Sequence, residues 1–244
     1  MVIDGVIFDF HGTLVAGGDP DRWVTAALRH LAESGKTPPE LAISELKSLS
    51  EHLDHIWQHA HTIDPNSDRD LSHARHHDVF TATVALHPGV DPALIEALYT
   101  VMPDQWIPFD DTLPVLRDLT TRGVKVVVLS NIGLDIRPHL TRTGILDLVD
   151  DVILSFEVGL VKPGPAIFAH ALERLGVPGN RTLMVGDSPR DDVGGTTLGI
   201  RTLILPRTDG PLHGLGAVLR LMGAPDDATN NGARDGTHQG ISLR

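Results

Sequence analysis

The first fourteen residues constrain the fold of this chain more than any other stretch. Segment 2–8 is apolar and rich in β-branched residues, which predicts a buried strand. The strand runs directly into Asp9, and Gly12 shortly afterwards allows the chain to turn sharply. Ligands of an open α/β sheet bind beside the carboxyl ends of its strands. We therefore expect Asp9 at the mouth of a crevice, either as a functional carboxylate or as an ordinary turn-capping residue.

The overall composition is typical of a globular protein, with 41% hydrophobic and 21% charged residues in a chain of 244. This length allows one domain with an insertion, or two small domains. The formal net charge of −12 argues against nucleic acid as the main partner, because binding to its backbone requires clustered cations. A small anionic substrate stays compatible with this charge. Since the chain has no cysteine, disulfides, thiol catalysis and cysteine-bound metals are excluded.

Two further features of the sequence concern location. No apolar run reaches the roughly 18 residues that a membrane helix needs. The N-terminus enters a strand without a basic and then apolar leader. We expect a cytoplasmic protein with no membrane partner.

The pattern of apolar residues changes twice along the chain. Residues 17–107 show helical spacing, as in the apolar face formed by Leu46, Leu49 and Leu53. From residue 110 onwards, continuous apolar strands alternate with helical segments, which predicts a parallel sheet covered on both faces. The expected strands of this part are 124–129, 151–154, 182–185 and 201–205.

The first strand is of the same type as these later strands and is expected to join their sheet. The predicted fold class is therefore α/β, with a doubly wound parallel sheet formed by residues 1–16 and 108–224. An all-helical insertion, residues 17–107, separates the two parts of this core. Residues 225–244 contain little that could be buried and are expected to form a disordered tail.

Polar residues follow several of the predicted strands. In chain order these are Ser130, Asn131, Lys162, Asp187, Asp191 and Asp192. Together with Asp9 they are expected to meet at one edge of the sheet. Clustered carboxylates in the absence of thiols favour a hard cation, Mg²⁺ before Ca²⁺. Carboxylates, an ammonium group and hydroxyl or amide donors are the groups that phosphoryl transfer through an aspartyl phosphate requires.

This set of motifs resembles the haloacid dehalogenase-like (HAD) hydrolase superfamily. Asp9-Phe10-His11-Gly12-Thr13-Leu14 is similar to its first motif, Asp-x-Asp-Gly-Thr. Ser130-Asn131 resembles the second motif, Lys162-Pro163 the third and Gly186-Asp187-x-x-x-Asp191 the fourth. The resemblance covers residues 1–14 and about 110–206, and implies a Rossmann-like core. The helical block resembles the cap that this family inserts after its first motif.

The resemblance implies a nucleophile and a metal site. Asp9 would attack phosphorus in line. Mg²⁺ would be held by the Asp9 carboxylate, the backbone carbonyl of His11 and Asp187, with Asp191 in support. Asp191 lies four residues after Asp187 and is preferred to Asp192, which is expected to be an exposed carboxylate at the start of a helix.

The resemblance also implies how the phosphoryl group is bound. Ser130 and Asn131 would bind its oxygens, and Lys162 would neutralise charge on both the nucleophile and the phosphate. The implied function is a Mg²⁺-dependent hydrolase that acts on a small phosphate monoester through an aspartyl-phosphate intermediate on Asp9.

Position 11 departs from the family's first motif, because His11 stands where its phosphatases have a second Asp. That Asp protonates the leaving group and then activates water. His11 could do the same work, since the ordinary pKa of imidazole is about 6.5 and the acidic cluster is expected to favour its protonated form.

Two alternatives to this assignment of His11 stay open. One is a 2-haloacid dehalogenase-type hydrolase acting on a carbon–halogen bond, which the complete set of metal-binding carboxylates disfavours. The other is a regulatory protein that binds metal and phosphate with little or no turnover. Of the three we expect the phosphatase.

Overall fold

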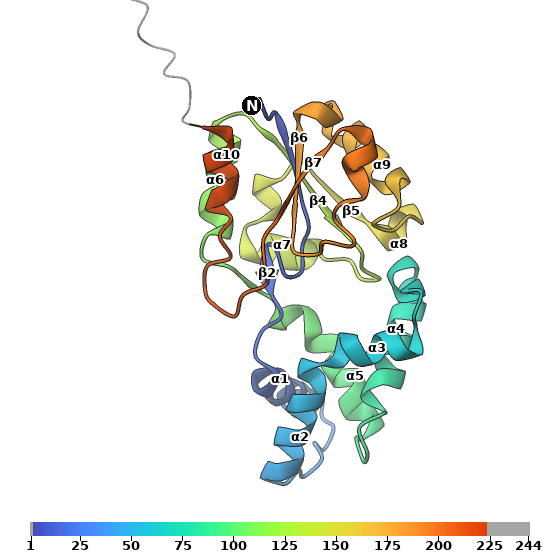
Figure 1. Cartoon of the computed structure of the whole chain (residues 1–244). Coiled ribbons are helices and arrows are strands. Elements are labelled where there is room, and N and C mark those ends of the chain that lie inside the picture. Colours follow the sequence, from blue (N-terminus) through green and yellow to red (C-terminus); the bar gives the residue numbers. More distant parts are fainter. Residues whose placement is uncertain (1, 224–244) are drawn as a thin grey trace, which may run out of the picture.

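The computed structural model describes residues 2–223 (Figure 1). At its centre is a five-stranded sheet with the strand order β5-β4-β1-β6-β7, in which all neighbouring strands are parallel. The strands are β1 (Gly5–Phe8), β4 (Lys125–Ser130), β5 (Asp151–Leu154), β6 (Thr182–Gly186) and β7 (Arg201–Ile204). The predicted parallel α/β sheet is confirmed. The predicted disordered tail, residues 225–244, lies outside the described residues.

Strand β1 occupies the middle of the sheet, and all four of its residues are buried. Phe8 is in register with Val128 of β4 on one side and with Val185 of β6 on the other. The next residue continues the pairing, since Asp9 N donates to Val185 O at 2.9 Å. The residues that follow β4 and β6 therefore flank Asp9.

Helices cover both faces of the sheet, as a parallel sheet of buried strands requires. Val6 and Phe8 of β1 belong to the hydrophobic core on the side of α6 and α10, whereas Ile7 packs on the side of α9. This alternation follows from the two-residue period of a strand. Figure 1 shows α6 and α10 on one side of the sheet and α9 on the other. The bounds are α6 (Thr112–Thr121), α7 (Arg137–Thr143), η3 (Leu146–Leu148), α8 (Ser155–Val158), α9 (Pro165–Leu175), η4 (Gly179–Arg181), η5 (Gly194–Leu198) and α10 (Gly216–Met222).

The helical insertion lies between two short strands, β2 (Val15–Ala16) and β3 (Ile107–Pro108), which pair antiparallel. The insertion extends beyond one end of the sheet, the end at which β1 runs into Asp9 (Figure 1). The predicted apolar face of Leu46, Leu49 and Leu53 lies on α2, and His55 separates this helix from α3. The elements are α1 (Pro20–Glu33), α2 (Ile43–Asp54), α3 (Ile56–Ile63), η1 (Asp68–Leu71), α4 (His73–Val84), α5 (Pro92–Val101) and η2 (Met102–Gln105).

Local sequence explains where the first of these helices begins. Asp19 caps α1 by accepting a hydrogen bond from Asp21 N at 2.9 Å, and Pro20 occupies the first helical position. The buried indole of Trp23 donates to Leu98 O at 2.9 Å and so joins α1 to α5. Among residues 2–223, no helix combines the length and the apolar composition that crossing a membrane requires.

His139 of α7 is a buried polar residue that connects the loop after β1 to the segment before β3. Its ring lies against those of Phe10 and Trp106, with centroid distances of 5.8 and 5.5 Å. Burial, assisted by the charge of Arg142, lowers the pKa of His139 to about 4. The imidazole is therefore neutral in the folded protein at neutral pH.

This neutral histidine predicts a loss of stability in acid. Between about pH 6.5 and pH 4 the unfolded chain protonates this imidazole and the folded chain does not, so stability should fall as the pH is lowered through that window. The variant His139→Phe keeps a buried ring and removes the titration. Its thermal midpoint, measured by scanning calorimetry, should depend less on pH than that of the wild type. Replacing the exposed Gln58, which carries no titratable group, by Ala should not change the pH dependence. An unchanged slope for His139→Phe would contradict neutral burial.

Candidate active site

The Asp9 carboxylate, at the carboxyl end of β1, is held by two donors. Lys162 Nζ lies 2.7 Å from Oδ1, and Thr13 Oγ1 lies 3.0 Å from Oδ2. All three residues are buried. Because each carboxylate oxygen has a partner, the orientation of the Asp9 side chain is fixed.

Lys162 is a buried cation with two carboxylate partners, since its Nζ also lies 2.7 Å from Asp192 Oδ1. Burial alone lowers the pKa of Lys162, but Asp9 and Asp192 outweigh it and the pKa is raised. Asn131 holds the lysine main chain. Lys162 N donates to Asn131 Oδ1 and Asn131 Nδ2 donates to Lys162 O, both at 2.8 Å. A charged ammonium group is thus positioned beside Asp9.

The loop after β1 approaches a second carboxylate, that of Asp187 after β6. Gly12 has φ 84°, and a Cβ at this position would lie 2.8 Å from Asp187 Oδ2. A residue with a side chain would be strained here and would also push Asp187 away. The same oxygen of Asp187 is paired with Arg207, whose side chain is 77% exposed.

Asp192 corrects an expectation from the sequence. It is completely buried, not exposed at a helix start. Turns, and not the expected helix, follow Asp187, and the next regular element is η5. In these turns the Asp192 side chain points into the protein. Ser188 N donates to its Oδ2 at 3.0 Å. A Cβ on Gly186 would overlap with the Asp192 carboxylate, which explains a glycine immediately before Asp187.

Asp191, which the sequence favoured as the supporting metal ligand, lies differently. Its side chain is 37% exposed and accepts a hydrogen bond from Ser188 Oγ at 2.9 Å. In the described part of the chain, the carboxylates brought together are those of Asp9, Asp187 and Asp192, with one oxygen from each within 4.8 Å of the others. Three carboxylate oxygens form a donor set that suits a hard divalent cation such as Mg²⁺. The geometry therefore fits the expected ion with Asp192 in place of Asp191.

These residues line a cavity of about 460 Å³ that continues to the helical insertion. The Ser130 hydroxyl lies in its wall and has no hydrogen-bond partner among residues 2–223, so it is available as a donor. Asn131 also lines the cavity, although its carboxamide is bonded to Lys162. The insertion contributes aromatic and charged residues to the opposite wall, among them Trp57, Arg69, Asp70 and His76.

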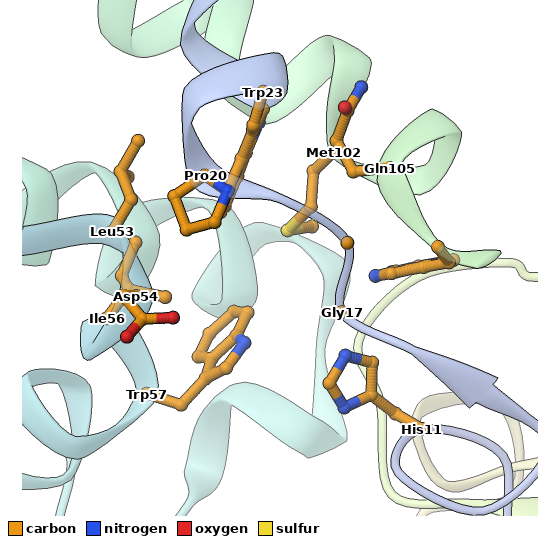
Figure 2. A pocket seen from close by; sticks show the side chains of 12 residues that line it. His11, Gly17, Pro20, Trp23, Leu53, Asp54, Ile56, Trp57, Met102 and Gln105 are labelled. Carbon is orange, nitrogen blue, oxygen red and sulfur yellow. The ribbon is translucent and has the colours of Figure 1, made fainter. Parts of the chain in front are cut away.

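His11 lies where this cavity adjoins a smaller pocket of about 100 Å³ between the core and the insertion (Figure 2). His11, Trp57 and Trp106 line both spaces. Figure 2 shows the imidazole of His11 across the smaller pocket from Leu53 and Ile56. Trp106 meets the His11 ring edge-on, with 6.4 Å between centroids.

The surroundings of His11 reverse the protonation state expected from the sequence. Burial lowers the pKa of His11, and this outweighs the opposite effects of Asp9 and Asp187. Arg207 lowers the pKa further. The imidazole is therefore neutral at neutral pH, a state that can accept a proton.

Comparisons with known proteins identify the family of this chain. A family model described as haloacid dehalogenase-like hydrolase matches residues 3–196. The chain belongs to this family.

Among curated proteins, haloacid dehalogenase-like hydrolase domain-containing protein 3 of Danio rerio is 35% identical over 127 residues, which are 49% of this chain and 52% of that protein. A glyceraldehyde 3-phosphate phosphatase of Methanothermobacter thermautotrophicus is 34% identical over 147 residues, 57% of this chain and 63% of that protein. The chain thus spans between about half and two thirds of these relatives.

Solved structures of HAD proteins share the fold over almost the whole chain. The HAD-hydrolase family protein YfnB of Bacillus subtilis, in a magnesium-bound form, has a TM-score of 0.65 at 18% identity, with 92% of this chain and 100% of that chain covered. The L-2-haloacid dehalogenase RSc1362 has a TM-score of 0.63 at 23% identity, with the same coverage. At these identities the likeness concerns the fold alone.

The position of Asp192 predicts which carboxylate matters for Mg²⁺. Addition of Mg²⁺ should raise the thermal midpoint of the wild type, because a ligand that binds the folded state stabilises it. Asp192→Asn should weaken Mg²⁺ binding by roughly tenfold or more, whereas Asp191→Asn should retain it. Isothermal titration calorimetry measures both affinities. If Asp191→Asn loses the ion and Asp192→Asn does not, the assignment from the sequence is restored.

Proposed function

We propose that the protein is a Mg²⁺-dependent phosphatase that hydrolyses a small phosphate monoester. The observation that carries this proposal is the Asp9 carboxylate, held by Lys162 and Thr13 at the end of the central strand, beside two further carboxylates and an open cavity. Membership of the HAD-like family and similarity to a curated phosphatase support the same activity.

In this proposal Mg²⁺ is bound by the carboxylates of Asp9, Asp187 and Asp192 and by the backbone carbonyl of His11. When bound, the ion neutralises charge on the phosphoryl oxygens and orients the ester. Asp191 stays at the rim of the cavity, bonded to Ser188.

Asp9 acts as the nucleophile. One of its carboxylate oxygens forms a bond to phosphorus while the bond from phosphorus to the leaving oxygen breaks, which leaves an aspartyl phosphate. The leaving oxygen departs with the bonding electron pair and takes a proton from water. Lys162, with its Nζ 2.7 Å from Asp9, reduces the repulsion between the carboxylate and the phosphate. Ser130 Oγ donates to a phosphoryl oxygen. Asn131 positions Lys162, and the second N–H of its carboxamide donates to the phosphate.

His11 acts on the water of the second step. A neutral imidazole takes a proton from the water that attacks the aspartyl phosphate, and Asp9 is released with inorganic phosphate. The lowered pKa of His11 suits this role as a base. Protonation of the leaving group is less favourable in this state, so the chemical step is expected to be intrinsically faster for esters of acidic alcohols such as phenols than for alkyl esters that bind equally well.

The insertion, residues 17–107, acts as a cap over the core formed by residues 1–16 and 108–224. Trp57 and its neighbours line the cavity on the side away from Asp9, where they exclude water and contact the leaving group. A covered site of this size favours a small ester over a phosphoprotein. Turnover confined to phosphopeptides would contradict this assignment.

The role of Asp9 predicts a first set of activities. The wild type should release phosphate from p-nitrophenyl phosphate in the presence of Mg²⁺ and lose this activity in a chelator. Asp9→Asn should reduce kcat by about 10³-fold or more, because the nucleophile is removed. Asp110→Asn, which changes an exposed carboxylate outside the cavity, serves as the control. Halide release from a 2-haloacid in chelator would instead indicate a dehalogenase.

The role of His11 predicts which step slows when it is removed. His11→Ala should lower the steady-state rate by about 10²- to 10⁴-fold, the range for loss of a general base. Phosphoenzyme should accumulate, so that rapid mixing shows a burst of phenol release. His11→Asp should turn over without this accumulation. A silent wild type together with an active His11→Asp variant would mean that His11 disables catalysis, and would favour a protein that binds metal and phosphate.

A further inference from the structure

The helical insertion brings one carboxylate into the active-site cavity. Asp70 lies in η1 and lines the same cavity as Asp9 and Lys162. Its side chain is 13% exposed, and its carboxylate accepts no hydrogen bond from any residue between 2 and 223. The neighbouring Arg69 Nε lies 3.8 Å away, which is beyond hydrogen-bond distance. Asp70 is thus a largely buried carboxylate that forms an ion pair with Arg69 at 3.8 Å and accepts no hydrogen bond within the described residues.

The loop that carries Asp70 is held rigidly from within the insertion. The side chain of Asp64 is 1% exposed and accepts hydrogen bonds from Arg69 N at 3.0 Å and from Arg69 Nη1 at 3.3 Å. Arg75 adds a third contact at 3.5 Å. Ser67 adopts φ 58°, a left-handed conformation that costs free energy in a residue with a side chain. Asp64 therefore accepts the hydrogen bonds that hold this loop, whereas the Asp70 carboxylate accepts none within the described residues.

The loop is also docked on the core at Asp70 itself. Ser155 Oγ, at the start of α8, donates to the main-chain carbonyl of Asp70. The same hydroxyl accepts a hydrogen bond from Ile132 N at 2.8 Å, in the loop that follows Ser130. The position of Asp70 is thus tied to the segment expected to bind the phosphoryl group.

Asp70 is not part of the group of carboxylates that fits a metal, which consists of Asp9, Asp187 and Asp192 in the described residues. Burial raises the pKa of Asp70 to about 6, opposed by Arg69 and Lys162 and assisted by Asp64 and Asp191. The carboxylate is mainly ionised at neutral pH and is a strong hydrogen-bond acceptor. Since it faces the cavity from the insertion, its natural partner is a donor on the bound molecule.

We propose that Asp70 is a specificity-determining residue that accepts a hydrogen bond from a hydroxyl or ammonium group on the leaving group of the ester. The substrate class is then a phosphate monoester of a polyol or an amino alcohol, which is bound in preference to a simple alkyl ester. This inference rests on the proposed phosphatase function and adds the chemistry of the leaving group. An ester without a donor would leave the buried Asp70 carboxylate without a hydrogen bond.

Esters matched in size test this inference. Glycerol 1-phosphate carries hydroxyl donors and 2-aminoethyl phosphate an ammonium donor, whereas propyl and ethyl phosphate carry none. Asp70→Asn keeps an acceptor oxygen but removes its charge, so kcat/KM should fall about tenfold for a donor ester, the difference between a hydrogen bond to a charged group and one to a neutral group. Its effect on the alkyl esters should stay within about threefold. Of the two donor esters, the one whose kcat/KM falls more in Asp70→Asn shows whether Asp70 accepts from a hydroxyl or from an ammonium group.

The control is Asp68→Asn, which removes an exposed carboxylate from the same turn. It should leave kcat/KM unchanged for every ester. An equal loss on donor and alkyl esters in Asp70→Asn, or no loss on either, would overturn the inference while turnover by the wild type still supported the phosphatase.

A binding measurement makes the test independent of turnover. Calorimetry with Mg²⁺ gives the Kd of glycerol 1-phosphate and propyl phosphate for Asp9→Asn and for Asp9→Asn combined with Asp70→Asn. Glycerol 1-phosphate should bind roughly tenfold tighter than propyl phosphate to the first variant, and this ratio should vanish in the second. If the wild type hydrolyses no ester, the proposed function fails, yet this ratio still decides the role of Asp70. Equal affinities in the first variant would reject it.

Discussion

The candidate active site depends on the buried ion pairs of Lys162 with Asp9 and Asp192. An ammonium group in the protein interior is stable only when its charge is compensated, and the two carboxylates supply that compensation at 2.7 Å each. The three residues come from the end of β1, the segment before α9 and the turns after β6. Their charges therefore tie together segments that are far apart in the chain, and loss of any one partner leaves another charge buried and unpaired.

The same ion pairs make it possible to crowd carboxylates at the end of the sheet. Because Gly12 and Gly186 have no side chain, there is space beside them for the carboxylates of Asp187 and Asp192. The positive charge of Lys162 offsets the repulsion between the clustered carboxylates. Arg207 balances Asp187 from the exposed side. A buried cation and an exposed one thus flank a group of oxygens suited to a divalent ion.

The insertion completes the cavity that the core leaves open. Trp57 and Asp70 face the carboxylates of the core, and Ser155 joins the insertion to the loop after β4. Burial by these surroundings, together with Trp106, accounts for the lowered pKa of His11 and the raised pKa of Asp70. Desolvation lowers the pKa of a histidine and raises the pKa of a carboxylic acid. The same enclosed space therefore keeps His11 neutral and raises the pKa of Asp70.

The sequence by itself determined the parallel sheet, the helical character of the insertion and the strand ends that carry Asp9, Ser130 and Asp187, because apolar periodicity and strand termini are local properties of the chain. Tertiary structure alone decided that Asp192 turns inward in place of its neighbour Asp191, since the turn after β6 sets which of two adjacent side chains is buried. It also decided the place of Asp70, whose contact with Ser155 spans 85 residues and leaves no trace in local spacing.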